Sequence, residues 1–358
     1  MREPTTRAWV EIDLGALRRN GAALAARAAA ILPMVKADAY GLGAVPVARA
    51  LERLAPWGYG VATVGEGIEL RSAGIGRPVL VFTPVVREEL SAVRDAGLTP
   101  SLSSAGDVRC WAALSGGPWH LAIDTGMSRA GVRWDAVHAL RDAVAACPPE
   151  GAFTHFHSAE LDDASMPEQL ARFEDALAQL PARPRLVHAE NSAALARAER
   201  SCWSLARPGI FLYGVSSGPG ARLRPEPVVA LRARVVEVRD VRAGESVSYD
   251  ATYRADGARR IATLAVGYAD GYRRALSNRG VALVRGRRVP VAGLVTMDMT
   301  MVDVTGVACE AGDVATLIGA DGAERMDVET VAAIGGISPY ELLTGLRGRL
   351  PRVYREDA

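Results

Sequence analysis

Residues 13–36, with the sequence DLGALRRNGAALAARAAAILPMVK, contain the pattern that decides the fold. In residues 13–30, Leu14, Leu17 and Leu24 recur at helical spacing while arginines fall on another side, which predicts an amphipathic helix. Residues 31–35 form a short apolar run, which is typical of a buried parallel strand. Lys36 follows this run directly. We therefore expect a helix, then a buried strand, and a cationic side chain where that strand ends.

The same alternation of helical stretches and short apolar runs continues to about residue 215. We predict eight buried strands, at residues 31–35, 59–63, 79–82, 99–102, 120–123, 152–156, 185–188 and 203–206. Amphipathic crossover helices between parallel strands are the repeating unit of α/β proteins. The pattern therefore predicts the α/β class and a (βα)8 barrel of the TIM type.

The pattern changes after residue 225, where runs of period two and hairpin turns replace the helical stretches. We expect two hairpins, one formed by residues 228–241 and 246–254 and one by residues 281–284 and 289–291. These predict a barrel over residues 10–225 and a mostly-β domain over residues 226–358, with residues 1–9 packing against the latter. In residues 295–304, Met297, Met299 and Met301 share one strand face, where core packing is favoured over substrate contact.

Composition limits the classes of function. The 358 residues are 49% hydrophobic and 23% charged, which provides a sizeable core and excludes a disordered chain. A net charge of +1 gives no field that would attract nucleic acid or an anionic membrane, so we expect a small-molecule partner. The four cysteines form no CxxC pair, and no segment resembles a signal peptide or a membrane span. These features together predict a cytoplasmic protein.

Polar residues follow several predicted strands, at the barrel end where catalytic groups lie. Lys36 follows the first strand, where its charge is costly unless the amine is paired or neutral. A neutral amine can form a Schiff base, whereas the alternative is an ion pair with Asp38 or Asp124. Ser192 and Gly209 follow the seventh and eighth strands, where such barrels often bind phosphate. A Schiff-base lysine beside a phosphate pocket predicts pyridoxal 5'-phosphate as the cofactor.

Two further groups at the strand ends have more than one interpretation. Arg207, just past the eighth strand, is placed to reach the pyridine nitrogen of such a cofactor. His155 and His157 lie two residues apart, as in some metal sites. The chain has only five histidines, so we favour a hydrogen-bonding role for His155 and expect no metal.

Motifs along almost the whole chain resemble those of alanine racemases. The matching segments are residues 9–14 (WVEIDL), 35–41 (VKADAYG), 124–129 (DTGMSR), 154–156 (THF), 191–194 (NSAA), 207–210 (RPGI), 247–249 (VSY), 267–271 (GYADG), 297–298 (MD) and 351–354 (PRVY). One such motif is weak, but this many in order, on predicted loops, is difficult to obtain by chance.

The resemblance implies a pyridoxal-phosphate barrel with a C-terminal β-domain that acts as a head-to-tail homodimer. Its implied activity is the interconversion of L-alanine and D-alanine, which supplies D-alanine for peptidoglycan. Lys36 matches the lysine that carries the cofactor and serves as one base, and Tyr268 matches the tyrosine that serves as the other from the partner subunit. Racemisation needs a base on each face of the α-carbon, so two groups from separate parts of the fold make chemical sense.

The resemblance also implies roles for the other matched residues. Arg207 contacts the pyridine nitrogen, and His155 forms a hydrogen bond with Arg207. The phosphate is held by Tyr40, Ser192, Gly209 and Ile210. The substrate carboxylate is bound by Arg129 and by the backbone of Met297. A phenol ordinarily titrates near pH ~10 and is a poor base at neutral pH. We therefore expect a cationic neighbour, either His155 or Arg207, to assist Tyr268.

Two of the positions at which the chain departs from the family pattern concern the site. Many relatives carry a lysine, often carbamylated, at the position of Ala122, where it orients the arginine that matches Arg129. Alanine cannot do this, so either a bound chloride or a nearby carboxylate orients Arg129, or the arginine is placed more loosely. The phosphate-contacting tyrosine of some relatives aligns with Gly348, so we expect one cofactor hydrogen bond to be missing.

Three other functions remain open at this stage. A serine or broad-spectrum amino-acid racemase is one, because no feature fixes the size of the pocket. A pyridoxal-phosphate amino-acid decarboxylase shares the two-domain plan. A non-catalytic pyridoxal-phosphate carrier shares the barrel but lacks the β-domain. The sequence also does not decide between a biosynthetic and a catabolic role for D-alanine.

Overall fold

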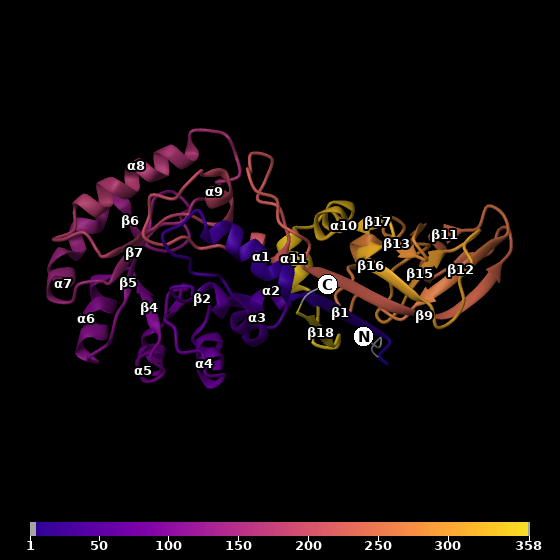
Figure 1. The fold of residues 1–358 in the computed structure, drawn as a ribbon, viewed down its shortest axis with the longest axis horizontal. Helices are drawn as coiled ribbons and strands as arrows, with labels where there is room; N and C mark the ends of the chain where they lie inside the picture. The colour runs from indigo at the N-terminus through magenta and orange to yellow at the C-terminus, as the bar shows by residue number, and fades with distance from the viewer. Residues whose placement is uncertain (1–4, 357–358) are drawn as a thin grey trace.

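The computed structural model describes residues 5–356 and shows a barrel beside an elongated β-rich lobe (Figure 1). The chain from α1 (Leu14–Ala25) to α9 (Ser192–Arg197) builds most of the barrel, residues 206–208 help to close it, and the later part of the chain builds most of the β-rich lobe. None of the helices in residues 5–356 combines the length and the apolar character needed to cross a bilayer. All four cysteines are free thiols.

The barrel wall consists of short parallel strands whose residues are almost all buried. Its strands are β2 (Tyr59–Val61), β3 (Val79–Val81), β4 (Thr99–Leu102), β5 (His120–Asp124), β7 (Gly151–Phe153) and β8 (Leu186–His188), in that order across the sheet, with β6 (Val132–Arg133) pairing with β5. Burial on both faces explains why these strands are apolar runs rather than alternating ones. The predicted strands two to seven are thus confirmed, and most are shorter than expected.

The first and eighth predicted runs close the barrel without forming regular strands. Leu32 N–H donates to the Ala206 carbonyl at 2.8 Å, and Met34 N–H donates to the Pro208 carbonyl at 2.8 Å. Single parallel bridges join Ile31 to Ala206 and Met34 to Gly60. Pro33 and Pro208 lack an N–H, so an uninterrupted ladder cannot form here. The prediction of full strands at residues 31–35 and 203–206 is therefore wrong in detail, although both runs occupy the expected places.

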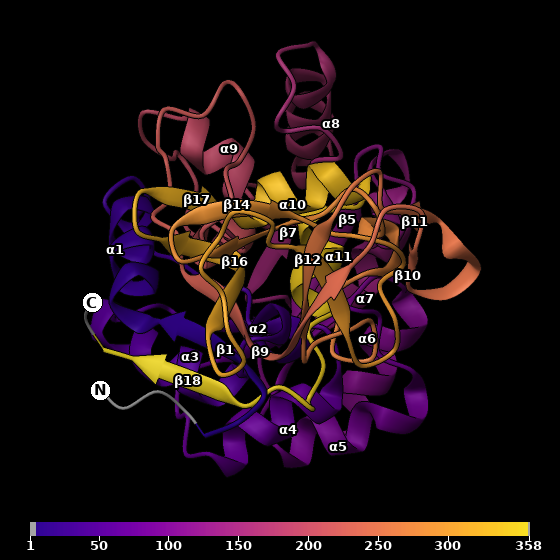
Figure 2. The same ribbon diagram turned by 90° about the vertical axis from the view of Figure 1, so that its right-hand side faces the viewer.

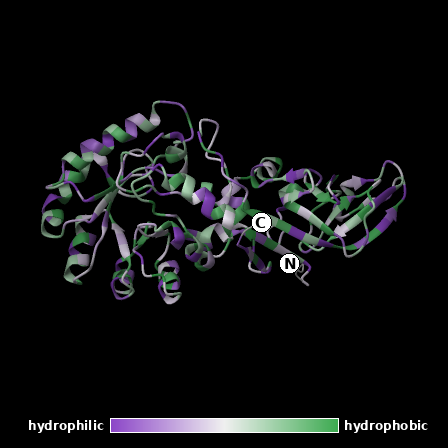
Figure 3. Cartoon of the chain, viewed as in Figure 1, coloured by the Kyte–Doolittle hydropathy of each residue, from purple (hydrophilic) through white to green (hydrophobic). Residues whose placement is uncertain are grey.

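Helices surround the barrel, and some of them begin at a residue whose side chain caps the helix. They are α1 (Leu14–Ala25), α2 (Lys36–Gly41), α3 (Ala44–Leu51), α4 (Val64–Ser72), α5 (Leu90–Asp95), α6 (Ala105–Ala113), α7 (Arg141–Ala146), α8 (Ser165–Ala178) and α9. Asp13 caps α1 by accepting the Ala16 N–H at 2.8 Å, and Leu14, Leu17 and Leu24 are buried as predicted. Hydrophilic and hydrophobic residues alternate around these helices (Figure 3).

A nine-stranded sheet forms the second lobe around the long strand β9 (Val229–Val241). The other strands of this sheet are β1 (Ala8–Asp13), β12 (Arg259–Leu264), β13 (Val281–Val284), β14 (Arg287–Pro290), β15 (Thr300–Asp303), β16 (Val314–Asp321), β17 (Glu324–Met326) and β18 (Arg352–Arg355). The strand β1 pairs with β9 and, in parallel, with β18, so the first and last strands of the described chain lie side by side (Figure 2).

The sheet tests parts of the expected domain plan. Ala8 and Trp9 lie in the second sheet, whereas residues 1–4 of the predicted 1–9 segment, and residues 357–358, are outside the described residues. Strand β1 continues in that sheet to Asp13, past the residue 10 at which we placed the start of the barrel. The boundary between residues 225 and 226 stays a prediction.

Two predictions for the second domain were wrong in part. Residues 246–254 do not pair with β9 as one strand, because β10 (Ser246–Val247) and β11 (Tyr253–Arg254) form a small hairpin of their own. Residues 295–299 precede rather than belong to strand β15. The hairpin of β13 and β14 is confirmed. Two helices, α10 (Val328–Gly335) and α11 (Pro339–Thr344), also occur, and α11 packs on α2 of the barrel (Figure 1).

Candidate active site

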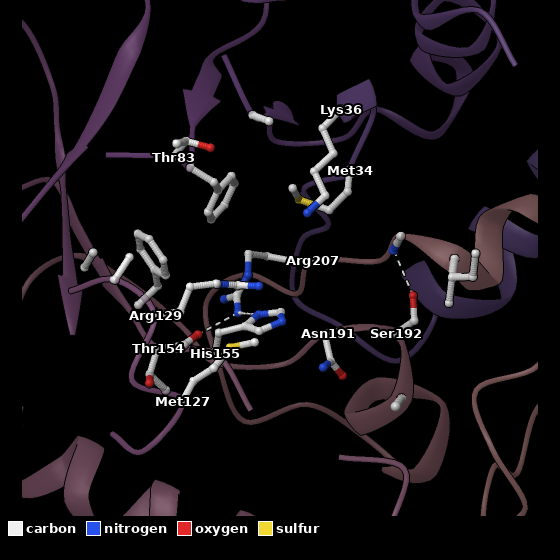
Figure 4. A pocket seen from close by; sticks show the side chains of 18 of the residues that line it. Met34, Lys36, Thr83, Met127, Arg129, Thr154, His155, Asn191, Ser192 and Arg207 are labelled. Atoms are coloured by element: carbon white, nitrogen blue, oxygen red, sulfur yellow. Dashed lines mark hydrogen bonds between the residues drawn. The ribbon is translucent and has the colours of Figure 1, made fainter. Parts of the chain in front are cut away.

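A pocket of about 850 Å³ opens at the carboxyl ends of the barrel strands (Figure 4). Its lining contains the barrel residues that we assigned to the cofactor and the substrate. These are Lys36, Tyr40, Arg129, His155, Ser192, Arg207, Gly209 and Ile210. Residues from the first, fifth, sixth, seventh and eighth predicted strands therefore meet in one place, as the barrel interpretation requires.

Lys36 is the only lysine of the chain, and its side chain points into the pocket toward Arg207 (Figure 4). Burial lowers the pKa of this amine, and the positive charges of Arg129 and Arg207 lower it further, against an opposing effect of Glu66. A lowered pKa increases the fraction of neutral amine, which is the nucleophilic and basic form.

The alternative of an ion pair between Lys36 and a neighbouring aspartate finds no support within residues 5–356. Asp38 instead accepts the Ala44 N–H at 2.7 Å, which fixes the loop before α3. Asp124 accepts the N–H groups of Gly126 and Ser128, both at 3.0 Å. Both carboxylates therefore accept hydrogen bonds from backbone N–H groups rather than pairing with Lys36.

The turn after Lys36 has an unusual backbone. Ala37 to Tyr40 all have φ between 51° and 58°, the left-handed region, which costs about 1–2 kcal/mol per non-glycine residue. Contacts from elsewhere hold the turn: Glu66 accepts the Ala37 N–H at 2.7 Å, and Ala39 N–H donates to the Val35 carbonyl at 2.8 Å. The strained turn places Lys36 and Tyr40 on the same pocket, and such strain is common at functional sites.

Ser192, Gly209 and Tyr40 form a cradle with room for an anion. The Ser192 hydroxyl oxygen accepts the N–H of Gly209 at 2.8 Å and that of Phe211 at 3.4 Å. A Cβ at position 209 would lie 2.5 Å from the Tyr40 hydroxyl, so only glycine leaves this space open. The two hydroxyl groups and the backbone of Gly209 surround a space that no Cβ fills, which suits the phosphate of the expected cofactor.

Arg207 is a buried cation held by neutral acceptors. Nη1 donates to Nδ1 and to the carbonyl oxygen of His188, both at 2.9 Å, and Nη2 donates to the carbonyl oxygens of Thr154 and Ala189 at 2.6 and 2.9 Å. Burial lowers the pKa of this guanidinium to about 9, and Glu190 opposes that change. Its Nε has no partner within residues 5–356, so one N–H remains for a ligand.

His155 lies next to Arg207, as expected. Nη2 of Arg207 donates to Nδ1 of His155 at 3.4 Å. Burial, with the charges of Arg207, Arg129 and Lys36, lowers the pKa of this imidazole to about 3, so it is neutral at physiological pH. The low pKa argues against the hypothesis that a cationic His155 assists Tyr268, because the ring sits among positive charges in a poorly solvated place. Arg207 remains the cation of that pair.

The second histidine of the predicted pair turns to a different partner. Nδ1 of His157 lies 2.7 Å from the Ser158 hydroxyl. No cluster of three or more histidine, cysteine or acidic side chains that could hold a metal occurs between residues 5 and 356.

Arg129 is exposed, and Ala122 beside it in the pocket lining supplies no charge. No carboxylate within residues 5–356 lies at ion-pair distance from Arg129. A nearby carboxylate of this chain was one of the groups expected to orient Arg129, and the described residues provide none.

Tyr268 and Met297, the two second-domain residues of the predicted site, are absent from the pocket lining formed by residues 5–356. They lie next to each other instead, since Tyr268 N–H donates to the Thr296 carbonyl and Ala269 N–H to the Met297 carbonyl, both at 3.0 Å. Tyr268 is 38% exposed, Met297 53% and Met299 45%. The preferred interpretation of the methionines as core residues is wrong for Met297 and Met299, because the loop before β15 lies on the surface.

Tyr340 and Ser217 are among the pocket residues that sequence reasoning missed. Tyr340 of α11 lines the pocket, with its ring centroid 6.0 Å from that of Tyr40. A tyrosine near the carboxyl terminus therefore does reach the site, although we expected the loss of one at Gly348. Ser217 also lines the pocket, and its hydroxyl is buried without a partner. No local signal marks either residue, because α11 reaches the site only through its packing on α2.

Comparisons with known proteins agree along the whole chain. Residues 12–217 match the family model "Alanine racemase, N-terminal domain" and residues 228–354 match "Alanine racemase, C-terminal domain". The alanine racemase of Symbiobacterium thermophilum is 40% identical, covering 97% of this chain and 96% of the relative, and that of Carboxydothermus hydrogenoformans is 39% identical, covering 97% and 99%.

Solved structures give the same result. The alanine racemase of Bacillus anthracis with bound L-Ala-P superposes with a TM-score of 0.90 at 31% identity, covering 99% of this chain and 96% of that one. The Bartonella henselae structure with covalently bound pyridoxal phosphate has a TM-score of 0.90 at 30% identity, covering 98% and 100%.

Proposed function

The chain belongs to the alanine racemase family, and we propose that it moves the α-proton of alanine between Lys36 of one subunit and Tyr268 of another. Its relatives are alanine racemases over nearly its full length, so the chain is an isomerase of the pyridoxal-phosphate-dependent racemase class. The observation that carries the residue assignment is the meeting of Lys36 and Arg207 with the Ser192 and Gly209 cradle in one pocket.

The residues of the pocket fit the cofactor. Lys36 would hold it covalently, and Tyr40, Ser192, Gly209 and Ile210 would hold its phosphate. When bound, pyridoxal 5'-phosphate supplies an electron sink that makes the α-proton of an amino acid acidic.

Arg207 would limit that electron sink. Its free Nε–H would donate to the pyridine nitrogen, and a guanidinium has no acceptor and does not readily release its proton. The ring nitrogen would therefore stay unprotonated, which favours return of the proton to the α-carbon over transamination. His155 and the backbone carbonyls around Arg207 would keep the guanidinium in this orientation.

Proton transfer needs one group on each face of the α-carbon. Lys36 has the lowered pKa that a base on one face requires. Tyr268 is a candidate for the other face, but it lies outside the pocket of its own chain and is partly exposed. A head-to-tail homodimer, in which the partner's Tyr268 reaches the pocket, accounts for both facts.

Arg129 and the backbone N–H of Met297 would bind the substrate carboxylate, the first from the barrel and the second from the partner subunit. Ala122 leaves Arg129 without the anionic neighbour that many relatives have. We propose that substrate itself, or a chloride ion, completes the placement of Arg129. Steady-state kinetics in chloride and in a chloride-free buffer would separate these two possibilities through the KM for alanine.

The breadth and the biological role of the reaction are also proposals. We propose alanine as the preferred substrate, and turnover of serine, lysine and arginine measured beside alanine tests the broader racemase. We further propose that the D-alanine serves peptidoglycan synthesis. Deletion of the gene should then make growth depend on added D-alanine, whereas a catabolic enzyme would not have this effect.

A direct test combines cofactor and turnover. The purified protein should show the visible absorbance of lysine-bound pyridoxal phosphate and should convert L-alanine to D-alanine in a coupled assay. Bound cofactor without racemisation would favour a carrier, and release of carbon dioxide from lysine or ornithine would favour a decarboxylase. Loss of activity on dilution of the dimer into monomers is expected, and an active monomer would refute the shared site.

A further inference from the structure

A row of polar side chains crosses the apolar interior of the barrel and ends at Arg207. Nη1 of Arg207 lies 2.9 Å from Nδ1 of His188, and Nε2 of His188 lies 2.8 Å from Nδ1 of His120. Nε2 of His120 lies 3.8 Å from a carboxylate oxygen of Glu150. Both imidazoles are fully buried. None of His188, His120 and Glu150 lines the candidate active site formed by residues 5–356.

The side-chain chemistry determines which atom is the donor in each of the two hydrogen bonds of this row. A guanidinium can only donate, so Nδ1 of His188 is the acceptor and its proton is on Nε2. Nε2 of His188 then donates to Nδ1 of His120, whose own proton must be on Nε2. That N–H faces a Glu150 carboxylate oxygen at 3.8 Å, which is within ion-pair distance but too long for a direct hydrogen bond, and Nε2 of His120 has no hydrogen-bond partner within residues 5–356. Because burial lowers the pKa of both imidazoles, each ring is neutral and has a single tautomer.

The row connects the two ends of the barrel. His188 is the last residue of β8, near the pocket, whereas His120 is the first residue of β5 and Glu150 directly precedes β7. Glu150 is half-buried at the far end, where Arg185 donates to it at 2.5 Å. The Glu150 charge is thus anchored on the side of the barrel opposite to the cofactor end.

Packing leaves the two rings little freedom. A Cβ at Gly151 would lie 2.6 Å from the His120 ring, so glycine makes room for it. The His188 ring stacks on Phe153 with centroids 5.2 Å apart, and Trp57 lies 5.6 Å from the His120 ring. A buried, aligned series of hydrogen bonds polarises along its length, and the effect is greater at low dielectric than in water.

Arg207 needs such support because its hydrogen-bond partners within residues 5–356 are carbonyl oxygens and ring nitrogens, and burial outweighs the nearby charge of Glu190, which raises its pKa. We propose that His188, His120 and Glu150 form an extended counter-ion, which stabilises the Arg207 cation and holds its free Nε–H toward the pyridine nitrogen. His120 and Glu150 are positioning residues in this account, because neither touches substrate or cofactor. The inference rests on the proposed role of Arg207.

Two substitutions of nearly equal shape isolate the hydrogen bond from packing. His120→Leu and His120→Asn both remove the ring, but asparagine keeps an oxygen near the place of Nδ1 that can accept from His188. Purely structural support would affect both variants alike. The extended counter-ion predicts that the leucine variant loses function and that the asparagine variant largely recovers it.

The first readout is the affinity for pyridoxamine 5'-phosphate, which has the ring nitrogen and the phosphate but cannot bond covalently to Lys36. Leaving a buried donor without its acceptor weakens binding through Arg207 by about tenfold in His120→Leu. In His120→Asn the affinity should stay within about threefold of wild type. Equal affinities in the two variants would overturn the proposal.

The second readout is the tautomer of His188, from nitrogen NMR of the cofactor-free protein labelled in its five histidines. We expect the proton on Nε2 in wild type and in His120→Asn, and a mixture of tautomers in His120→Leu. A wild-type His188 with its proton on Nδ1 would contradict the proposal even if the protein racemises alanine. A wild-type protein that binds no pyridoxal 5'-phosphate would instead refute the proposed function.

Glu150→Gln keeps the experiment decisive if His120→Leu does not fold. The change removes the charge at the far end, and we expect a two- to fivefold weaker affinity for pyridoxamine 5'-phosphate, about the effect of a partly screened ion pair. Glu174→Gln is the matched control, since Glu174 pairs with Arg183 at 2.7 Å on the surface and contacts no histidine. Equal affinities of the Glu150→Gln and Glu174→Gln proteins would contradict the extended counter-ion.

Discussion

The barrel pocket and the Tyr268 turn of the second domain differ in how their groups are prepared. In the barrel, Lys36, His155 and Arg207 are surrounded by protein, and burial shifts the pKa of each. On the second domain, the side chains of Tyr268 and Met297 are partly exposed. The barrel therefore carries a prepared half of a site, whereas the second domain presents its groups at the surface.

The Tyr268 turn is nevertheless rigid. Asp270, which is fully buried, accepts a hydrogen bond from Arg7 at 2.6 Å and one from the Gly267 N–H at 3.0 Å. The same carboxylate lies 3.3 Å from Nε of Arg349. If another subunit surrounds the Tyr268 side chain, this side chain must be exposed in its own subunit and held by a fixed backbone. The Tyr268 turn meets both conditions. The difference between the regions thus supports two half-sites that are completed by dimerisation.

Replacing Lys36 should have the largest effect, because it removes both the cofactor attachment and one base. Lys36→Ala should lower racemisation by at least about a thousandfold. Borohydride reduction followed by mass spectrometry should label the single lysine of the wild-type holoenzyme and nothing in the variant. Lys36→Arg keeps the charge and should be equally inactive. An active variant, or a label elsewhere in the chain, would remove Lys36 from the mechanism.

Tyr268→Phe should have the next largest effect and should separate the two half-sites. Loss of one acid–base group lowers turnover by about a hundred- to ten-thousandfold. Cofactor attachment to Lys36 should be unchanged, because Tyr268 is not among the residues that we propose to hold the cofactor. Tyr249→Phe is the control, since Tyr249 is 70% exposed and on the same domain. Normal racemisation by Tyr268→Phe would show that the second half-site does not supply the base.

Tyr340→Phe probes the one second-domain side chain within residues 5–356 that enters the pocket of its own chain. We expect the Tyr340 hydroxyl to bond the phosphate, so its loss should weaken cofactor affinity by about five- to tenfold. Tyr354→Phe is the matched control, because the Tyr354 hydroxyl bonds the Leu42 carbonyl at 3.0 Å outside the pocket lining. Fluorescence titration of the cofactor-free proteins measures both, and equal affinities would leave Tyr340 without a role in binding.

The smallest effect concerns the pH dependence of stability. An unfolded histidine takes up a proton near pH ~6.5, whereas folded His155 does so only near pH 3. The unfolded state therefore binds more protons between these values, and the free energy of unfolding falls as pH decreases through this window. His155→Gln should reduce that fall by a few kcal/mol, on the order of 1.4 kcal/mol per pKa unit. Urea unfolding of the cofactor-free protein at several pH values measures it.

The exposed His138 gives the control for this last prediction. His138→Gln should leave the pH dependence of unfolding as it is in wild type. If His155→Gln and His138→Gln behave alike, the environment of His155 is more solvated than its burial indicates.

Much of the fold could be predicted from periodicity, because parallel strands buried on both faces must be apolar and their crossovers amphipathic. Lys36, Ser192, Arg207 and Gly209 could be assigned from their places after predicted strands, whereas the roles of Tyr40, Tyr268 and Met297 came from the resemblance to alanine racemases. The closure of the barrel at Pro33 and Pro208 could not be predicted in detail. The two prolines lack the N–H groups needed for a continuous strand pairing, and the segments that pair there are far apart in the sequence.

The remaining features depend on contacts between distant segments. Ala37 has no preference for the left-handed region, and its turn is held by Glu66, 29 residues away. Tyr340 enters the pocket because α11 packs on α2, and His120 meets His188 across 68 residues. No local pattern encodes such pairs, so they appear only in the folded chain.

Mixing two inactive variants tests the shared site most directly. Lys36→Ala and Tyr268→Phe subunits, unfolded together and refolded at equal ratio, should form mixed dimers in which one site has both Lys36 and Tyr268. The account predicts recovery of about a quarter of wild-type racemase activity, since half of the dimers are mixed and one of their two sites is complete. No recovery, with mixed dimers demonstrated by mass spectrometry, would contradict the supply of Tyr268 by the partner subunit.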